Sequence, residues 1–222
     1  MPLSIRDAVE NGFNRTLKRN GLMIVAAIIL LNLAGGFTGL YTSSVNPSAM
    51  MGSAVLLGVF GLALSIVSVA ISIIALRVFV SDETESIPDD YVRRNMGWAL
   101  VHMIVGGVVF ALIVVAGLFL LVIPGIYLLL ALFFWSVYVA VEDVSFVEAM
   151  QRSWSVTKGH KWRLLGLLIV VGLVNAALVL PGALIQSGGM EASGMLVAQV
   201  LSGFGTVFTL AAQADAYNQL TG

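Results

Sequence analysis

The stretch that decides the fold is Gly21–Leu76, GLMIVAAIILLNLAGGFTGLYTSSVNPSAMMGSAVLLGVFGLALSIVSVAISIIAL, a run of 56 residues without a charged side chain. A single helix of this length would measure about 84 Å, whereas the hydrocarbon core of a bilayer is about 30 Å thick. The run therefore has to fold back on itself. The polar, proline-containing segment 41–48 is where it can turn. We expect one transmembrane helix at residues 21–40 and a second at 50–80.

The same reasoning applies to Met96–Val141, a second run that contains no acidic residue, lysine or arginine. Its break is Pro124-Gly125, because proline removes a backbone donor and glycine permits a tight turn. With 59% hydrophobic and 10% charged residues over 222 positions, the chain is predicted to be all-α, a polytopic membrane bundle that forms one domain over residues 1–222. The four further transmembrane helices are expected at 97–123, 125–141, 164–180 (ended by Pro181-Gly182) and 195–214.

The basic residues predict how these helices are oriented. In the six-helix arrangement, all eleven lysines and arginines fall in segments on one side of the membrane, and the three opposite loops contain none. The positive-inside rule then places both termini in the cytoplasm of a multi-pass protein of the cell membrane. The residues on the cytoplasmic side are Arg6, Arg15, Lys18, Arg19, Arg77, Arg93, Arg94, Arg152, Lys158, Lys161 and Arg163.

Two segments outside the spans, residues 4–19 and 145–158, are predicted to be amphipathic helices at the membrane interface. Each opens with a capping-box pattern, in which a serine, Ser4 or Ser145, precedes an acidic residue by three positions. The second segment also carries large apolar side chains at helical spacing, and such a face is expected to enter the lipid. Its members are Phe146, Met150 and Trp154.

A third segment, Ser86–Asp89, opens in a similar way before the third span. Each of the three segments is followed by a helix, a proline-containing turn and a returning helix. This layout fits three tandem units of interfacial helix plus helix hairpin. The alternative is that capped helices and proline turns are general features of membrane proteins, and both interpretations stay open.

The region around the second interfacial helix carries a recognisable pattern. It consists of Val122–Leu128 (VIPGIYL), Val141–Gly159 (VEDVSFVEAMQRSWSVTKG) and Trp162–Leu165 (WRLL). This pattern resembles the membrane-domain family attached to some glycerophosphoryl diester phosphodiesterases, together with its stand-alone prokaryotic relatives of unknown function. The resemblance implies a six-helix membrane fold. It carries over no catalytic residue, because the phosphodiesterase part of such fusions is a separate soluble barrel.

The sequence contains none of the short motifs of zinc hydrolases, serine hydrolases or phosphate-binding loops. No aspartate lies within the core of a predicted helix, which argues against an intramembrane aspartyl protease and against a carboxylate-coupled pump. We therefore expect a protein that is not an enzyme, with no catalytic residue, no cofactor and no metal site.

Basic and aromatic side chains gather where the second interfacial helix leads into the span at 164–180. Such a group can hold the phosphate of an anionic lipid, because each basic residue near an anionic surface contributes about 1 kcal/mol. An ordinary positive-inside anchor with an aromatic belt has the same composition, so this reading stays open as well. The candidates for headgroup binding are Arg152, Trp154, Lys158, His160, Lys161, Trp162 and Arg163.

Neutral polar side chains in or near the spans form a second group of candidates. In one interpretation they line a path for a solute, and in the other they hydrogen-bond one helix to the next. They are Asn32, Ser65, Ser68, Ser72, His102, Asn175 and Gln199.

These observations predict a non-enzymatic membrane protein with a structural, assembly or lipid-organising role. A transporter or channel for a small or apolar solute is the alternative. The expected partners are membrane lipids with anionic headgroups in the cytoplasmic leaflet. A protein partner or a second copy of the chain stays open, and no nucleic acid is expected.

Overall fold

The computed structural model of the chain describes residues 3–44, 47–81 and 83–222. Within these ranges the chain is helical apart from short connections, as the long apolar runs predict. The helices are α1 (Ile5–Thr16), α2 (Arg19–Ser44), α3 (Pro47–Val80), α4 (Asp89–Arg93), α5 (Met96–Leu120), α6 (Val122–Ala131), α7 (Trp135–Glu142), α8 (Phe146–Val156), α9 (Lys161–Ser187) and α10 (Glu191–Thr221).

Six stretches of the described helices are long and apolar enough to cross a membrane. The fourth stretch consists of α6 and α7 together. The predicted all-α fold with six membrane-spanning segments is confirmed at this level, and the protein is a multi-pass membrane protein. The six segments are Arg19–Thr38, Ala54–Val80, Met96–Leu120, Val122–Glu142, Lys161–Ser187 and Glu191–Thr221.

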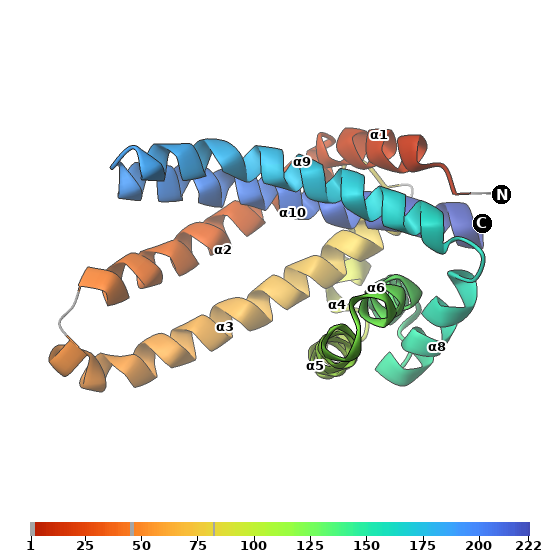
Figure 1. The fold of residues 1–222 in the computed structure, drawn as a ribbon, viewed down its shortest axis with the longest axis horizontal. Helices are drawn as coiled ribbons and strands as arrows, with labels where there is room; N and C mark the ends of the chain where they lie inside the picture. The colour runs from red at the N-terminus through yellow and green to blue at the C-terminus, as the bar shows by residue number, and fades with distance from the viewer. Residues whose placement is uncertain (1–2, 45–46, 82) are drawn as a thin grey trace.

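The long helices are arranged as three hairpins (Figure 1). α9 and α10 lie side by side along their length, and α2 and α3 extend towards the same end of the molecule. α5 and α6 are seen nearly end-on in this view, so their hairpin runs crosswise to the other two. Both chain termini lie at the opposite end. The crosswise hairpin departs from the predicted bundle, in which six helices would lie alongside one another.

The turn near the second predicted proline differs in position from the prediction. Residues 45–46 of the first predicted turn, 41–48, lie outside the described residues, and Pro47 is the first residue of α3. α5 ends at Leu120 and the chain turns at the extended residue Leu121, so Pro124 falls within the first turn of α6. Proline fits in a first turn because the N–H groups there have no partner inside the helix.

The third predicted proline turn is wrong. α9 continues through Pro181 to Ser187, and the turn to α10 contains Gly189 with a left-handed backbone (φ 86°). In a membrane-spanning helix, local adjustments can satisfy the carbonyl that a proline leaves free, so the helix need not end there. α10 is correspondingly longer than the predicted span 195–214.

The fourth span is interrupted, whereas the sequence predicts one continuous helix at this place. α6 ends at Ala131, and α7 begins after a short turn. The side chains of α8 complete the hydrogen bonding of this turn: Ser153 Oγ donates to the Ala131 carbonyl and accepts from the Phe134 N–H, both at 3.0 Å. Thr157 Oγ1 donates to the Ala131 carbonyl at 3.2 Å. Ser153 and Thr157 are both fully buried.

Both predicted serine caps are present. Ser4 Oγ accepts from the Asp7 N–H at the start of α1, and Ser145 Oγ accepts from the Glu148 N–H at the start of α8, each at 3.3 Å. The third segment differs, because α4 begins after Pro88 without a side-chain cap. The three-unit repeat therefore stays a prediction.

α1 packs on protein along one face. A Cβ atom at Gly12 would come within 2.9 Å of the Ala212 backbone, so only a residue without a side chain permits this approach to α10. The Ser4 N–H donates to Gln219 Oε1 at 2.7 Å near the end of the chain. On its other side α1 exposes Phe13. The position of α1 at a membrane interface remains a prediction.

Candidate functional site

α8 packs against α5, α6 and α7 with the face that the sequence analysis assigned to lipid. Met150 is buried, and Phe146 and Trp154 are partly buried against the same apolar core. A Cβ atom at Gly106 of α5 would lie 2.8 Å from Phe146 Cβ, which shows how closely the two helices approach. The stripe packs at least in part on protein, because α5, α6 and α7 offer these side chains an apolar surface, and its contact with lipid stays a prediction.

Trp154 belongs to a cluster with Tyr127 of α6 and Lys161 at the start of α9. The two rings meet edge to face with their centroids 5.6 Å apart. Lys161 Nζ lies 4.6 Å from the Tyr127 ring centroid and 5.6 Å from the Trp154 ring centroid. Both rings therefore attract the ammonium group by cation–π interactions. Lys161 Nζ also donates to Thr157 Oγ1 at 3.5 Å.

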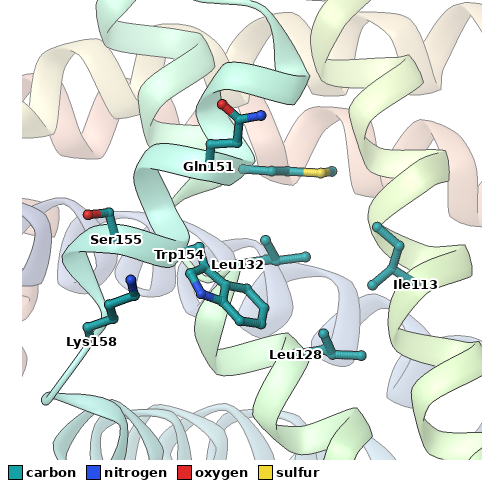
Figure 2. Close-up of a pocket in the computed structure, with 8 residues that line it drawn as sticks. Ile113, Leu128, Leu132, Gln151, Trp154, Ser155 and Lys158 are labelled. Carbon is teal, nitrogen blue, oxygen red and sulfur yellow. The ribbon is translucent and has the colours of Figure 1, made fainter.

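A groove of about 470 Å³ lies on the Trp154 side of this cluster. Figure 2 shows Lys158, Ser155 and Trp154 on the α8 side of the groove, with Ile113 and Leu128 across from them. Most of its surface is apolar, and among the residues that the structure describes Lys158 is the one charged residue in its lining. The complete lining consists of Ile113, Leu128, Leu132, Met150, Gln151, Trp154, Ser155 and Lys158.

A second groove, of about 230 Å³, lies on the Tyr127 side, between α6 and α9. It is almost wholly apolar, and Lys161 is the one charged residue in the described part of its lining. The Tyr127–Trp154 pair thus has an apolar groove on each side, and each groove is lined by one lysine. The lining consists of Ile123, Ile126, Tyr127, Leu130, Lys161, Trp162 and Leu165.

Arg152 differs from the two lysines because it forms ion pairs with carboxylates. It pairs with Glu142, and its Nη2 lies 2.5 Å from Glu148 Oε1. The hydrogen bond to Glu148 raises the pKa of the Arg152 guanidinium above its ordinary value, so the charge persists at every physiological pH. Among the described residues, no carboxylate lies within ion-pair distance of Lys158 or Lys161.

Some of the remaining predicted headgroup candidates contact the protein backbone, and the others line the grooves. Arg163 Nη1 donates to the Leu3 carbonyl at 3.3 Å, and His160 Nδ1 lies 3.1 Å from the Lys158 carbonyl oxygen. Gly159, with φ 81°, provides the left-handed turn between α8 and α9. The structure brings four of the seven candidates together at the grooves, and these are Trp154, Lys158, Lys161 and Trp162.

Four of the seven predicted intramembrane polar residues also meet, in a separate groove of about 310 Å³ between α2, α3 and α10; they are Asn32, Ser65, Ser68 and Gln199. The other three lie elsewhere. Ser72 Oγ donates to the Ser68 carbonyl, and Asn175 Nδ2 donates to Val171 O and Thr209 Oγ1. The centroid of the His102 ring lies 3.9 Å from that of the Trp98 ring.

Sequence reasoning missed a buried ionic network at the end of α3. The Arg77 side chain is 1% exposed, and it donates to the Ala140 carbonyl (2.6 Å), the Tyr91 carbonyl (2.9 Å) and Asp143 Oδ1 (2.9 Å). Arg94 Nε lies 2.9 Å from Asp143 Oδ2, an ion pair that lacks hydrogen-bond geometry at this nitrogen. Two features of the sequence pointed to this network: Arg77 is the first charged residue after a long apolar run, and Asp143 belongs to an acidic turn after the fourth span.

Within the described ranges, no three histidine, aspartate or glutamate side chains gather where they could hold a metal ion. Comparison with known proteins gave no match among curated proteins and none among solved structures. The family model that matches covers residues 3–220 and is described as Domain of unknown function (DUF7847). This description does not mention the phosphodiesterase-associated membrane domains, so that resemblance stays a prediction. Because the match spans nearly the whole chain, the protein belongs to the DUF7847 family.

Proposed function

We propose that this protein is a non-enzymatic component of the cell membrane that binds and organises lipid, holding an anionic phospholipid where α8 meets α9. The observation that carries the proposal is the pair of lysines, Lys158 and Lys161, which have no carboxylate partner among the described residues and line two apolar grooves. The proposal assigns no catalytic step to the chain.

The chemistry of the site matches a phospholipid in two respects. Two ammonium groups attract the phosphate, and the rings of Tyr127 and Trp154 keep Lys161 beside the grooves. The apolar grooves offer surface to acyl chains, which gain about 0.8 kcal/mol for each CH₂ group removed from water. Because the aromatic pair separates two grooves, a lipid with two chains fits better than a lipid with one.

The same proposal includes an orientation. The turn between α8 and α9 lies at the end of the molecule that holds both termini (Figure 1). The basic residues of the chain favour the cytoplasm for that end. The lysines would then face the cytoplasmic leaflet, where anionic lipids are enriched.

The test is a titration of the purified protein in a neutral detergent with dioleoyl phosphatidylglycerol, followed by the shift in Tm. We expect the Lys158→Gln/Lys161→Gln double variant to bind this lipid about thirtyfold more weakly, because two basic groups contribute about 1 kcal/mol each. Lys18→Gln is the matched control, since Lys18 is an exposed lysine outside both grooves. It should bind like the wild type.

Two comparisons sharpen this test. Dioleoyl phosphatidylcholine, which is zwitterionic, should stabilise the wild type less than phosphatidylglycerol, and the single-chain lysophosphatidylglycerol should bind more weakly than the two-chain lipid. Equal binding of phosphatidylglycerol by the wild type and the double variant would show that the proposed site is wrong. Equal binding of the one-chain and two-chain lipids would remove the role of the second groove.

A further inference from the structure

The groove between α2, α3 and α10 differs in chemistry from the two lipid grooves. The ten described residues that line it include no charged side chain, and polar atoms make up a large part of its surface. Ser65 and Ser68 lie near the middle of the span Ala54–Val80, and Asn32 and Gln199 lie within two other spans. The groove is therefore a polar surface at the depth of the hydrocarbon core.

Hydrogen bonding leaves part of this surface without a partner. Asn32 Nδ2 donates to the Gln199 carbonyl and to Ser202 Oγ, both at 3.3 Å, which uses the two donors of its amide, whereas its oxygen has no partner among the described residues. The Gln199 side-chain amide and the Ser68 hydroxyl form no hydrogen bond with the described residues. In hydrocarbon no solvent is present to satisfy such groups, and each one costs about 1–3 kcal/mol when it stays unpaired.

Glycines keep the groove open. A Cβ atom at Gly36 would come within 3.4 Å of Gln199 Nε2, so the absence of a side chain lets this amide lie over the α2 backbone. Gly35 also lines the groove, and a Cβ atom there would meet nothing within 4 Å. An unfilled volume of about 310 Å³ remains beside the unpaired amide.

We infer that this groove is a binding site for a neutral membrane amphipath that carries a hydroxyl group, such as a long-chain alcohol or a diacylglycerol. The hydroxyl would accept from Gln199 Nε2 and donate to Asn32 Oδ1, two atoms that have no partner among the described residues. A charged headgroup is disfavoured, because the lining offers no counter-ion and the surrounding medium is apolar. The apolar tail would extend from the groove into the surrounding lipid.

The experiment is photolabelling of the protein in phosphatidylcholine nanodiscs with hexadecanol that carries a diazirine next to its hydroxyl end. Labelled peptides should come from α2, α3 or α10. Gln199→Leu should reduce this labelling about fivefold, the equivalent of one neutral hydrogen bond. Gly35→Leu should reduce it at least as much, because the new side chain enters the groove without a clash.

Gly58→Leu is the matched control. Gly58 lies on α3 outside the groove, and a Cβ atom there also meets nothing within 4 Å, so the substitution adds the same side chain to a lipid-facing helix. It should leave labelling unchanged. Unlabelled hexadecanol should compete with the probe, whereas glycerol should not, because the groove opens towards lipid. Equal labelling of Gly35→Leu and Gly58→Leu, or competition by glycerol, would overturn the inference.

A second copy of the chain is the other occupant to test. The native sequence contains no cysteine, so Ser65→Cys carries a single thiol in this groove. We expect little disulfide-linked dimer on oxidation of this variant in nanodiscs. A high yield would show that a helix of another copy covers the groove and would overturn the lipid assignment. The lipid site at α8 and α9 would be unaffected by either result.

Discussion

Asp143 lies in the short connection between α7 and α8 and joins three parts of the structure. It pairs with Arg77 and Arg94 through its two carboxylate oxygens. Its backbone is left-handed (φ 54°), a conformation that aspartate and asparagine tolerate better than most residues. Through this single side chain the end of α3, the end of α4 and the end of α7 are held together.

Asp143→Asn is expected to lower the free energy of unfolding by about 3 kcal/mol, because it leaves Arg77 and Arg94 close together without a counter-charge. The substitution keeps the shape of the side chain and its tolerance of the left-handed backbone. Denaturation in mixed detergent micelles, followed by circular dichroism, measures the change. Arg6→Ala is the control, since the Arg6–Glu10 pair is exposed to solvent and should contribute less than about 1 kcal/mol. Equal losses in the two variants would contradict this account of the network.

The sequence predicted some residues of the lipid site but not its geometry. Trp154, Lys158, Lys161 and Trp162 stand close together in the chain, so a local pattern was enough to find them. Tyr127, Ile113 and Leu128 come from other helices, and their approach depends on the crosswise packing of α5 and α6. Arg152 was grouped with the lysines because spacing alone does not show that two glutamates already bind it.

At the scale of elements, α8 supplies hydrogen bonds to the turn that interrupts the fourth span. Its Ser153 hydroxyl binds both sides of the turn between α6 and α7, through the Ala131 carbonyl and the Phe134 N–H. The sequence did not predict the break, because residues 132–134 contain neither proline nor glycine. It predicted a break at Pro181 instead, where α9 is continuous. The break between α6 and α7 thus coincides with tertiary hydrogen bonds and not with a proline, whereas α3 and α6 each begin at or near a proline.

Ser153→Ala should destabilise the protein by about 2 kcal/mol, because it leaves a buried N–H and weakens the satisfaction of a buried carbonyl. Ser155→Ala provides the comparison: Ser155 lies on the same helix and is exposed. The measurement is the Tm of each purified variant in the same detergent. A Tm for Ser153→Ala equal to that of Ser155→Ala would show that the turn does not depend on this hydroxyl.

At the scale of the whole molecule, an even number of spans places both termini on one side of the membrane. We expect the link between α9 and α10 to lie on the other side. In whole cells, a membrane-impermeant maleimide should label Ser187→Cys at once and Gly222→Cys only after permeabilisation, since the chain has no other thiol. Labelling of Gly222→Cys in intact cells would reverse the proposed orientation.

Length, hydropathy and charge were sufficient to predict six spans, because each of these properties is local to a segment. The crosswise direction of the α5–α6 hairpin was not predictable in this way. It depends on which apolar faces meet, and spans such as α5 are apolar around much of their circumference, so they carry little periodic signal. The Gly12–Ala212 approach was hidden for a related reason, since its two residues come from opposite ends of the chain.

The dependence of the fourth span on α8 also has a consequence for biosynthesis. The Ala131 carbonyl accepts hydrogen bonds from hydroxyl groups that lie 22 and 26 residues further along the chain. When this span first leaves the translocon, those residues are still in or near the ribosome, so the nascent helix has to pass through an incompletely bonded stage. A chain truncated before Ser153 would lack the hydroxyl groups that bond to the turn between α6 and α7. We expect quality-control proteases to degrade such a chain.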